Sequence, residues 1–188
     1  IRFESQDVVG IKIVNLIEYL DKPFTIYEDI TIPVKEYSSD EFQFKFETSE
    51  KRMISTELEY QTGDFWTGEK QTFKTQFSIK PFSGFNIQTE YEKNQVKLSG
   101  NNFNTELYNL ELGIYPTPRT AIFSNLQYDN VSNALGLFAK LQHTIRPGSD
   151  VYLVYTHNWI SVGDQIFDFD LVTVSKISSL KINYTLRL

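Results

Sequence analysis

The sequence predicts an all-β fold, an antiparallel up-and-down transmembrane β-barrel of about ten strands, either complete here or part of a larger barrel. Residues 180–188 alternate between apolar and polar at every position, as a strand with one face in lipid and the other toward water requires. Similar alternation recurs along the chain in runs of about 9 to 12 residues, longer than most strands of soluble sheets. The connections between the runs are mostly short and long in turn, which is typical of outer-membrane barrels.

Each expected strand has one apolar and one polar face. The first strand lies within residues 8–20, where the pattern is weakest. In residues 41–47, phenylalanine occupies every second position, with Gln43, Lys45 and Glu47 on the opposite face. The other expected strands are residues 53–61, 72–80, 85–92, 108–114, 122–128, 135–145, 151–155 and 180–188. This is an even number of strands, so both ends of the chain are expected on the same side of the membrane.

The connections support the same fold independently of the strands. Short connections rich in Pro, Gly, Ser or Asp, which favour tight turns, occur at residues 49–52, 81–84, 116–119 and 147–150. Between them lie mostly longer connections, at residues 21–40, 62–70, 93–104, 130–132 and 157–171. Outer-membrane barrels have short periplasmic turns and longer outer loops, so we expect every tight turn on the periplasmic side.

The composition excludes several classes of partner and site. The net charge of −6 is spread along the chain without blocks of one sign. Nucleic acid is therefore not expected as a partner, because binding it requires a clustered basic surface. Cysteine is absent, which excludes a disulfide scaffold and a thiolate metal site. No apolar run reaches the roughly 20 residues of a membrane-spanning helix.

The expected polar face carries charges of both signs. Two interpretations are open: a hydrated interior in which the charges pair with one another, or a path for a solute. Because no run of one sign occurs, the sequence predicts no particular ion selectivity. The charged residues on this face are Lys45, Glu57, Glu59, Lys74, Glu90, Glu111, Lys140, Lys181 and Arg187.

No catalytic residue, metal site or cofactor is expected. His143 lies on the apolar face, and pairing across the turn at 147–150 predicts that it opposes Leu153, with no serine nearby on that face. An interfacial histidine is therefore expected rather than a lipid hydrolase site. His157 is expected at a loop edge, too far from His143 along the sequence to share a metal. The spacing of Glu57 and Glu59 overlaps that of glycosidase carboxylates, but simple alternation produces it too.

Aromatic residues in the longer connections are the candidate ligand-binding residues. They are Phe65, Trp66, Phe103 and Trp159, with Phe167 in the last long connection. Aromatic rings on outward loops can stack on sugar rings or anchor a partner protein. The same rings can instead fold a loop over the barrel mouth or join the aromatic girdle of a membrane protein.

Several segments resemble one known family: residues 24–33, 62–68, 123–128, 145–155 and 180–184. Together they look like the C-terminal barrel region of uncharacterised Gram-negative surface proteins that carry an N-terminal family 9-like carbohydrate-binding module. The most specific match is Arg-Pro-Gly-Ser-Asp at 146–150, whereas Leu188 departs from the terminal Phe of the family. The resemblance implies an outer-membrane location and a link to surface glycans. It also implies that this chain is the tail end of a longer barrel, so that its strands would not close alone.

Residues 1–188 are therefore expected to form a single outer-membrane β-barrel domain or a C-terminal barrel segment. Its expected function is that of a membrane anchor or passage linked to surface glycan binding or uptake. The expected partners are outer-membrane lipid, glycan and other outer-membrane subunits. Two alternatives remain open: a soluble up-and-down barrel that holds a small apolar ligand, and an outer-membrane hydrolase.

Overall fold

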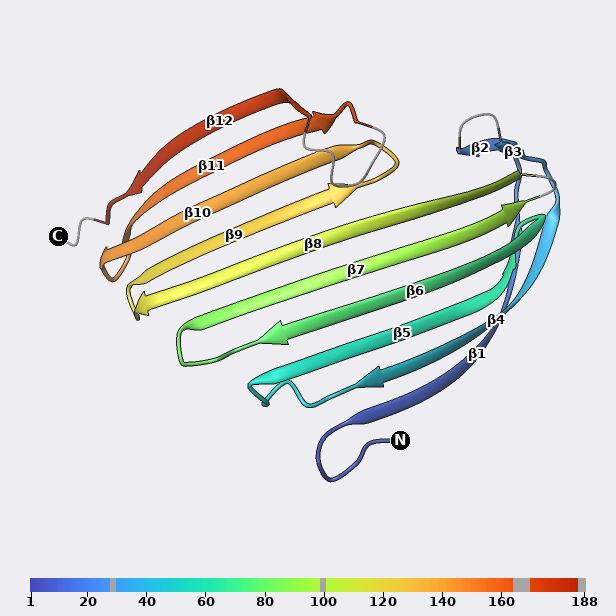
Figure 1. The fold of residues 1–188 in the computed structure, drawn as a ribbon, viewed down its shortest axis with the longest axis horizontal. Helices are drawn as coiled ribbons and strands as arrows, with labels where there is room; N and C mark the ends of the chain where they lie inside the picture. The colour runs from blue at the N-terminus through green and yellow to red at the C-terminus, as the bar shows by residue number, and fades with distance from the viewer. Residues whose placement is uncertain (28–29, 99–100, 164–169, 186–188) are drawn as a thin grey trace. The chain divides into compact units, whose positions relative to one another are not determined.

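A computed structural model describes residues 1–27, 30–98, 101–163 and 170–185, and this part of the chain contains strands and no helix (Figure 1). The strands are β1 (Val8–Tyr19), β2 (Phe24–Tyr27), β3 (Ile30–Ile32), β4 (Glu36–Glu47), β5 (Ile54–Phe65), β6 (Gly68–Ile79), β7 (Phe85–Leu98), β8 (Asn101–Thr117), β9 (Thr120–Asp129), β10 (Ala134–Arg146), β11 (Ser149–Ser161) and β12 (Leu171–Asn183). The first expected strand is thus confirmed as β1.

The long strands form one sheet of 10 strands in the order β1-β4-β5-β6-β7-β8-β9-β10-β11-β12, while β2 pairs only with β3. Neighbours run in opposite directions (Figure 1). The predicted all-β, antiparallel, up-and-down fold is therefore confirmed. Within the described ranges, β1 and β12 each pair with one strand of this sheet.

The contacts divide the chain into two compact units. The first unit comprises Ile1–Ser49, Thr56–Thr75 and Glu92–Thr105, and the second comprises Glu50–Ser55, Gln76–Tyr91 and Glu106–Leu188. Each unit contains parts of several long strands.

Strand register gives both units a polar and an apolar face. In the first unit, Lys45 pairs with Gly10 and Glu59. The next row pairs Phe44 with Ile11 and Tyr60. Because side chains alternate between the two sides of a strand, these rows lie on opposite faces. The second unit repeats the arrangement with an apolar row of Leu110, Leu126 and Leu137, and with a polar row of Asn109, Gln127, Gly136, Asn158 and Ser175.

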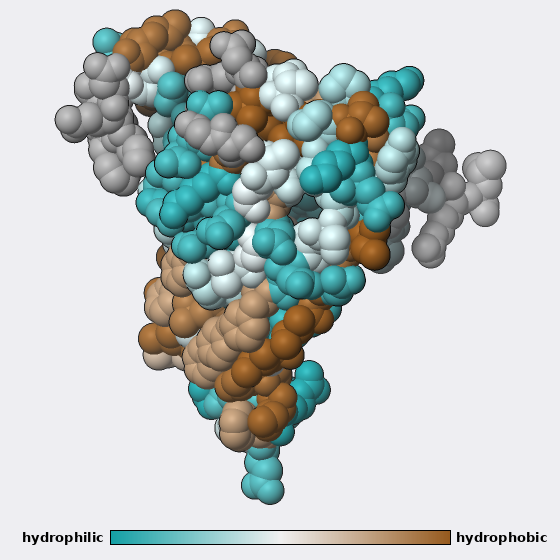
Figure 2. All heavy atoms as spheres, turned by 90° about the vertical axis from the view of Figure 1, so that its right-hand side faces the viewer, coloured by the Kyte–Doolittle hydropathy of each residue, from teal (hydrophilic) through white to brown (hydrophobic). Residues whose placement is uncertain are grey.

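The apolar face is largely uncovered in both units. Ile11 and Ile13 are 67% and 77% exposed, and Leu153 and Leu180 are 48% and 66% exposed. Figure 2 shows large hydrophobic patches, coloured brown, in the lower half of that view. A soluble protein rarely leaves so much contiguous apolar surface in contact with water.

The predicted tight turns are confirmed, but two segments that were predicted as longer connections are not loops. Residues 118–119 join β8 to β9, and residues 147–148 join β10 to β11, with Gly148 at a φ of 83°. In contrast, residues 62–70 and 93–104 are mostly strand, so that only Trp66 and Thr67 separate β5 from β6. Backbone pairing continues there although the apolar alternation stops, because ladder hydrogen bonds do not require an apolar face.

The most buried hydrophobic residues form a small core in the first unit, which the sequence did not predict. The residues Ile32, Tyr37, Val96 and Leu98 are at most 7% exposed. The hairpin of β2 and β3, which lies in the expected long connection 21–40, packs its apolar residues against them. Tyr37 lies on the same face of β4 as Lys45, so the hairpin packs on the polar-face side of the strand.

Candidate functional site

An ion cluster lies on the polar face of the first unit. The Lys45 ammonium nitrogen lies 2.5 Å from Glu57, 3.2 Å from Glu59 and 3.6 Å from Glu47. The register explains this arrangement, since Lys45 pairs with Glu59 while Glu47 pairs with Glu57 on the adjacent position of the same face. Three carboxylates around one ammonium leave local negative charge on this face.

A hydrogen-bonded ladder continues from the ion cluster toward β8. The Asn94 side-chain oxygen accepts a hydrogen bond from the Thr72 hydroxyl at 2.7 Å. Its side-chain nitrogen donates to the Thr105 hydroxyl and to the Glu92 carboxylate, each at 3.0 Å. Lys74 lies 3.7 Å from the same Glu92 carboxylate. The interpretation of a self-paired polar face is confirmed for these charges. Glu57 and Glu59 both contact Lys45, which is the arrangement of an ion pair rather than of a catalytic acid and base.

The paired groups border an open groove. It has a volume of about 540 Å³ and is lined by Lys12, Gln43, Lys45, Glu59, Gln61, Lys70, Thr72, Lys74, Glu92 and Asn94 with their neighbours. Both signs of charge and several amides thus face one water-accessible space. Such a surface can be wetted along its length, because every polar group keeps a partner or contacts water.

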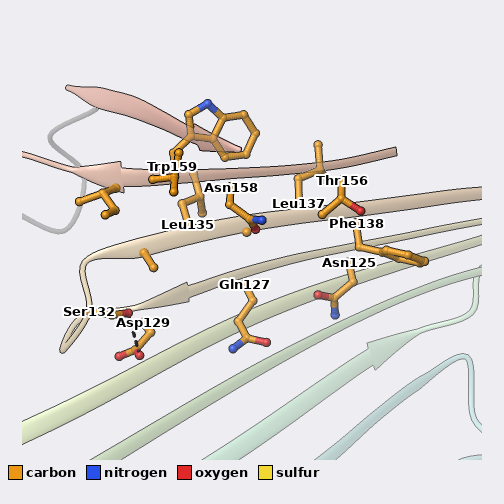
Figure 3. Close-up of a pocket in the computed structure, with 14 residues that line it drawn as sticks. Asn125, Gln127, Asp129, Ser132, Leu135, Leu137, Phe138, Thr156, Asn158 and Trp159 are labelled. Atoms are coloured by element: carbon orange, nitrogen blue, oxygen red, sulfur yellow. Dashed lines mark hydrogen bonds between the residues drawn. The ribbon is translucent and has the colours of Figure 1, made fainter. Parts of the chain in front are cut away.

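The polar face of the second unit is built mainly from amides and hydroxyls. Asn125 donates to the Asn109 side-chain oxygen at 2.7 Å and to Glu111 at 3.3 Å, and Asn158 donates to the Ser175 hydroxyl at 2.9 Å. A hollow of about 490 Å³ opens beside Gly136, because glycine places no side chain between its neighbours. Figure 3 shows Asn125 and Gln127 projecting to the same side of the sheet at this hollow.

The structure brings three of the four candidate aromatic residues together. Phe65, Trp66 and Phe103 are partly buried and pack against the small core of the first unit. The Trp66 ring makes edge contacts with Phe24 and Tyr37, at centroid distances of 5.4 and 5.0 Å. These contacts stabilise the β2–β3 hairpin, and the ligand-binding role of the three residues stays a prediction.

Trp159 lies in the second unit, whereas the other three candidates lie in the first. Its ring stacks on the His157 imidazole at a centroid distance of 3.7 Å. Trp159 also borders the hollow at Gly136, with its ring on the opposite side of the sheet from Gln127 (Figure 3). Phe167 and Arg187 lie outside the described residues.

His143 lies on the apolar face as predicted, but its predicted partner and the predicted loop-edge position of His157 are wrong. His143 pairs with Val151 instead of Leu153, because the turn at 147–148 is tight and an irregularity between Thr144 and Arg146 sets the register. The His143 Nδ1 atom lies 3.0 Å from the Thr120 hydroxyl. His157 lies within β11 rather than at a loop edge, and its ring nitrogens contact the hydroxyls of Tyr155 and Thr173.

The described residues lack two kinds of feature. No helix there is long and apolar enough to cross a membrane. No group of three or more His, Cys, Asp or Glu side chains in those ranges could hold a metal ion.

Comparisons with known proteins add one distant likeness. No family model matches the sequence, and no curated protein matches it significantly. A solved structure described as the NanC porin in a rhombohedral crystal form aligns over 97% of this chain and 99% of that chain. The identity is 12% and the TM-score is 0.40. A likeness this distant transfers no property of that protein to this chain.

Two features of the polar face were not found from the sequence. One is the row from Asn109 to Ser175, whose members come from the separate strands β8 to β12. No local signal reveals such a row, because it depends on the register of every strand pair. The other is the β2–β3 hairpin, for which the sequence does hold a signal: Phe-Thr-Ile at 24–26 and Ile-Thr-Ile at 30–32 both alternate.

Proposed function

We propose that this chain forms an outer-membrane β-barrel, or one part of its wall, with the apolar face against lipid and the polar face along a hydrated passage. The observation that carries this proposal is the contrast between the two faces. The apolar face is uncovered, with Ile13 77% exposed, while the polar face holds the ion cluster around Lys45.

The same contrast disfavours the soluble ligand-holding barrel. Such a barrel would bury its apolar face in an interior and expose its polar face. Among the described residues, the buried hydrophobic ones are Ile32, Tyr37, Val96 and Leu98, all within the first unit. Apolar surface in water costs about 25 cal/mol per Å², so uncovered Leu and Ile residues along whole strands favour lipid as the solvent.

Aromatic rings on the apolar face of the second unit support the same orientation. Tyr91, Tyr108 and Tyr128 follow one another across β7, β8 and β9, with centroid distances of 4.8 and 6.2 Å. Aliphatic Leu110 and Leu126 come next along the strands. Near the turn between β6 and β7, the ring centroids of Phe82 and Phe85 lie 5.2 Å apart. Two sets of rings that are separated along the strands by aliphatic residues are typical of a lipid band with its girdles.

The resemblance to glycan-associated surface proteins extends the proposal. It favours a Gram-negative outer membrane as the location and surface glycan as the cargo or ligand. Strands β1 and β12 each have one strand partner in the described sheet. Further strands, from a longer chain or from another outer-membrane subunit, would complete the wall in this proposal, because an unpaired strand edge is unfavourable in lipid.

The first test of membrane insertion is extraction and heat-modifiability. The native protein is expected to need detergent for extraction and to migrate differently on a gel before and after boiling, because closed barrels resist unfolding by detergent at room temperature. A chain that stays monomeric in plain buffer and shows no shift would overturn the proposal and favour the soluble barrel.

The ion cluster supports a second test, in planar bilayers with a KCl gradient. Replacement of Lys45 by Gln should shift the reversal potential toward cation selectivity, because it leaves Glu47, Glu57 and Glu59 without their ammonium partner. Lys51→Gln, in the turn after β4, removes the same charge away from that cluster and is the matched control. Equal shifts for the two variants would show that the polar face of the first unit does not line the conducting path.

A further inference from the structure

We propose that the hollow at Gly136 binds a neutral hydroxylated solute, such as one ring of a saccharide. This inference rests on the proposed passage and deepens it by giving a glycan solute a binding site and a neutral charge. The hollow lies wholly within that unit.

Gly136 creates the hollow because its neighbours in the polar row carry long side chains. It pairs with Gln127 on one side and with Asn158 on the other. A Cβ atom on residue 136 would lie 3.1 Å from the Asn158 side-chain oxygen, tighter than ordinary contact. The space of about 490 Å³ falls in the usual range of small-molecule sites.

The groups around the hollow both donate and accept hydrogen bonds, as sugar hydroxyls do. Asn158 donates to Ser175, and its side-chain oxygen lies next to Gly136. Within the described ranges, no hydrogen bond involves the side chains of Gln127 or Thr156, so an amide and a hydroxyl are available to a ligand. An amide supplies donors and an acceptor together, which suits adjacent hydroxyl groups on one ring.

An aromatic ring lies beside these polar groups. Phe138 is on the same face as Asn125 and Thr156, with which it pairs in register. The centroid of its ring lies 6.2 Å from the centroid of the Phe123 ring. A sugar ring has an apolar side made of C–H groups, and an aromatic surface next to amides can bury that side while the hydroxyls are satisfied.

The charge at the hollow favours a neutral solute. Its lining includes no Lys, Arg or His, and the one carboxylate, Asp129, already accepts from the Val131 backbone N–H at 2.9 Å and the Ser132 hydroxyl at 3.0 Å. A charged solute would lose water there without gaining an opposite charge. The groove of the first unit differs, because lysines and glutamates line it.

The test compares methyl glucoside with methyl glucuronide, which carries a carboxylate on the same ring. Binding to the full chain, folded in detergent, is measured by saturation-transfer NMR, which does not require conductance. We expect saturable binding of the glucoside and at least about five-fold weaker binding of the glucuronide, since its carboxylate would lose water at the hollow without gaining an opposite charge. Absence of glucoside binding, or equal binding of the two, would overturn the inference.

Two variants and a control locate the binding. Gly136→Leu should abolish glucoside binding by filling the hollow, and Gln127→Ala should weaken it about five-fold by removing one amide. The Gln127 side chain makes no hydrogen bond in the described structure, so its replacement keeps the test valid if Gly136→Leu fails to fold. Ala121→Leu adds bulk to the same face of β9, roughly 13 Å along the strand from Asn125, and should bind as the native chain does. Native-like binding by both Gly136→Leu and Gln127→Ala would refute the assignment.

Failure of this inference and failure of the proposed function give different results. A chain that is heat-modifiable and conducts ions, yet binds no glucoside, contradicts only the solute site. A chain that binds the glucoside through Gly136 and Gln127 but is soluble in plain buffer contradicts only the membrane barrel.

Discussion

Replacement of Leu153 by Arg is expected to lower the free energy of unfolding in lipid by about 2 to 4 kcal/mol, the cost of a cation near the bilayer midplane on a barrel's lipid face. Leu153 pairs with Leu141 and Leu180, so its row is apolar on both sides. Arginine there would place its charge among aliphatic side chains and lipid. The measurement is a guanidinium titration of the protein folded into phospholipid vesicles, followed by tryptophan fluorescence.

Ile145→Arg is the matched control for this prediction. Ile145 is 49% exposed, close to the 48% of Leu153, but it lies next to the turn between β10 and β11. The loss in free energy of unfolding should be only about 0 to 1 kcal/mol there, because arginine at the membrane surface reaches the headgroups and water. Equal costs at the two positions would show no dependence on depth and would contradict the assignment of this face to lipid.

Replacement of Trp66 by Ala is expected to release the β2–β3 hairpin and to destabilise the first unit by about 3 kcal/mol, the lower end for removal of a large packed aromatic. Trp66 contacts Phe24 of the hairpin, Tyr37 of β4 and Phe65 of β5. Its loss would leave a cavity between the hairpin and the strands. The most direct measurement is limited trypsin digestion, with faster cleavage after Lys22 and Lys35, which flank the hairpin.

Phe82→Ala serves as the control for an aromatic residue with little burial. Phe82 is 65% exposed and lies in the turn before β7. Its replacement should leave cleavage at Lys22 and Lys35 unchanged. If Trp66→Ala digests like the native chain, the hairpin is held by other contacts, and Trp66 becomes available for the ligand-binding role that the sequence suggested.

The faces of the strands were predictable because alternation is a local property. Phe42 and Phe44 share a face with each other whatever their partners are, since side chains alternate along any extended strand. The turn at 147–150 was equally predictable, because proline restricts the backbone to turn conformations and glycine permits conformations that other residues avoid. Such signals do not depend on the rest of the fold.

The ends of the strands and the small core were not predictable in the same way. Strand β8 begins at Asn101, in a stretch without apolar alternation, because its backbone pairs with neighbouring strands. Val96 and Leu98 become buried only when the β2–β3 hairpin packs on them. Both the hairpin and the segment with Val96 and Leu98 can be seen in the sequence, but no local feature indicates that segments so far apart along the chain pack together.

The sequence by itself determined the all-β class, the order of the long strands and which residues share a face, because each follows from a period of two and from short turns. Only the tertiary structure decided that Lys45 meets three glutamates, that His143 opposes Val151, and that Gly136 opens a hollow between Gln127 and Asn158. The physical reason is register: a shift of one or two residues between strands leaves every local pattern intact but changes which side chains meet across the sheet.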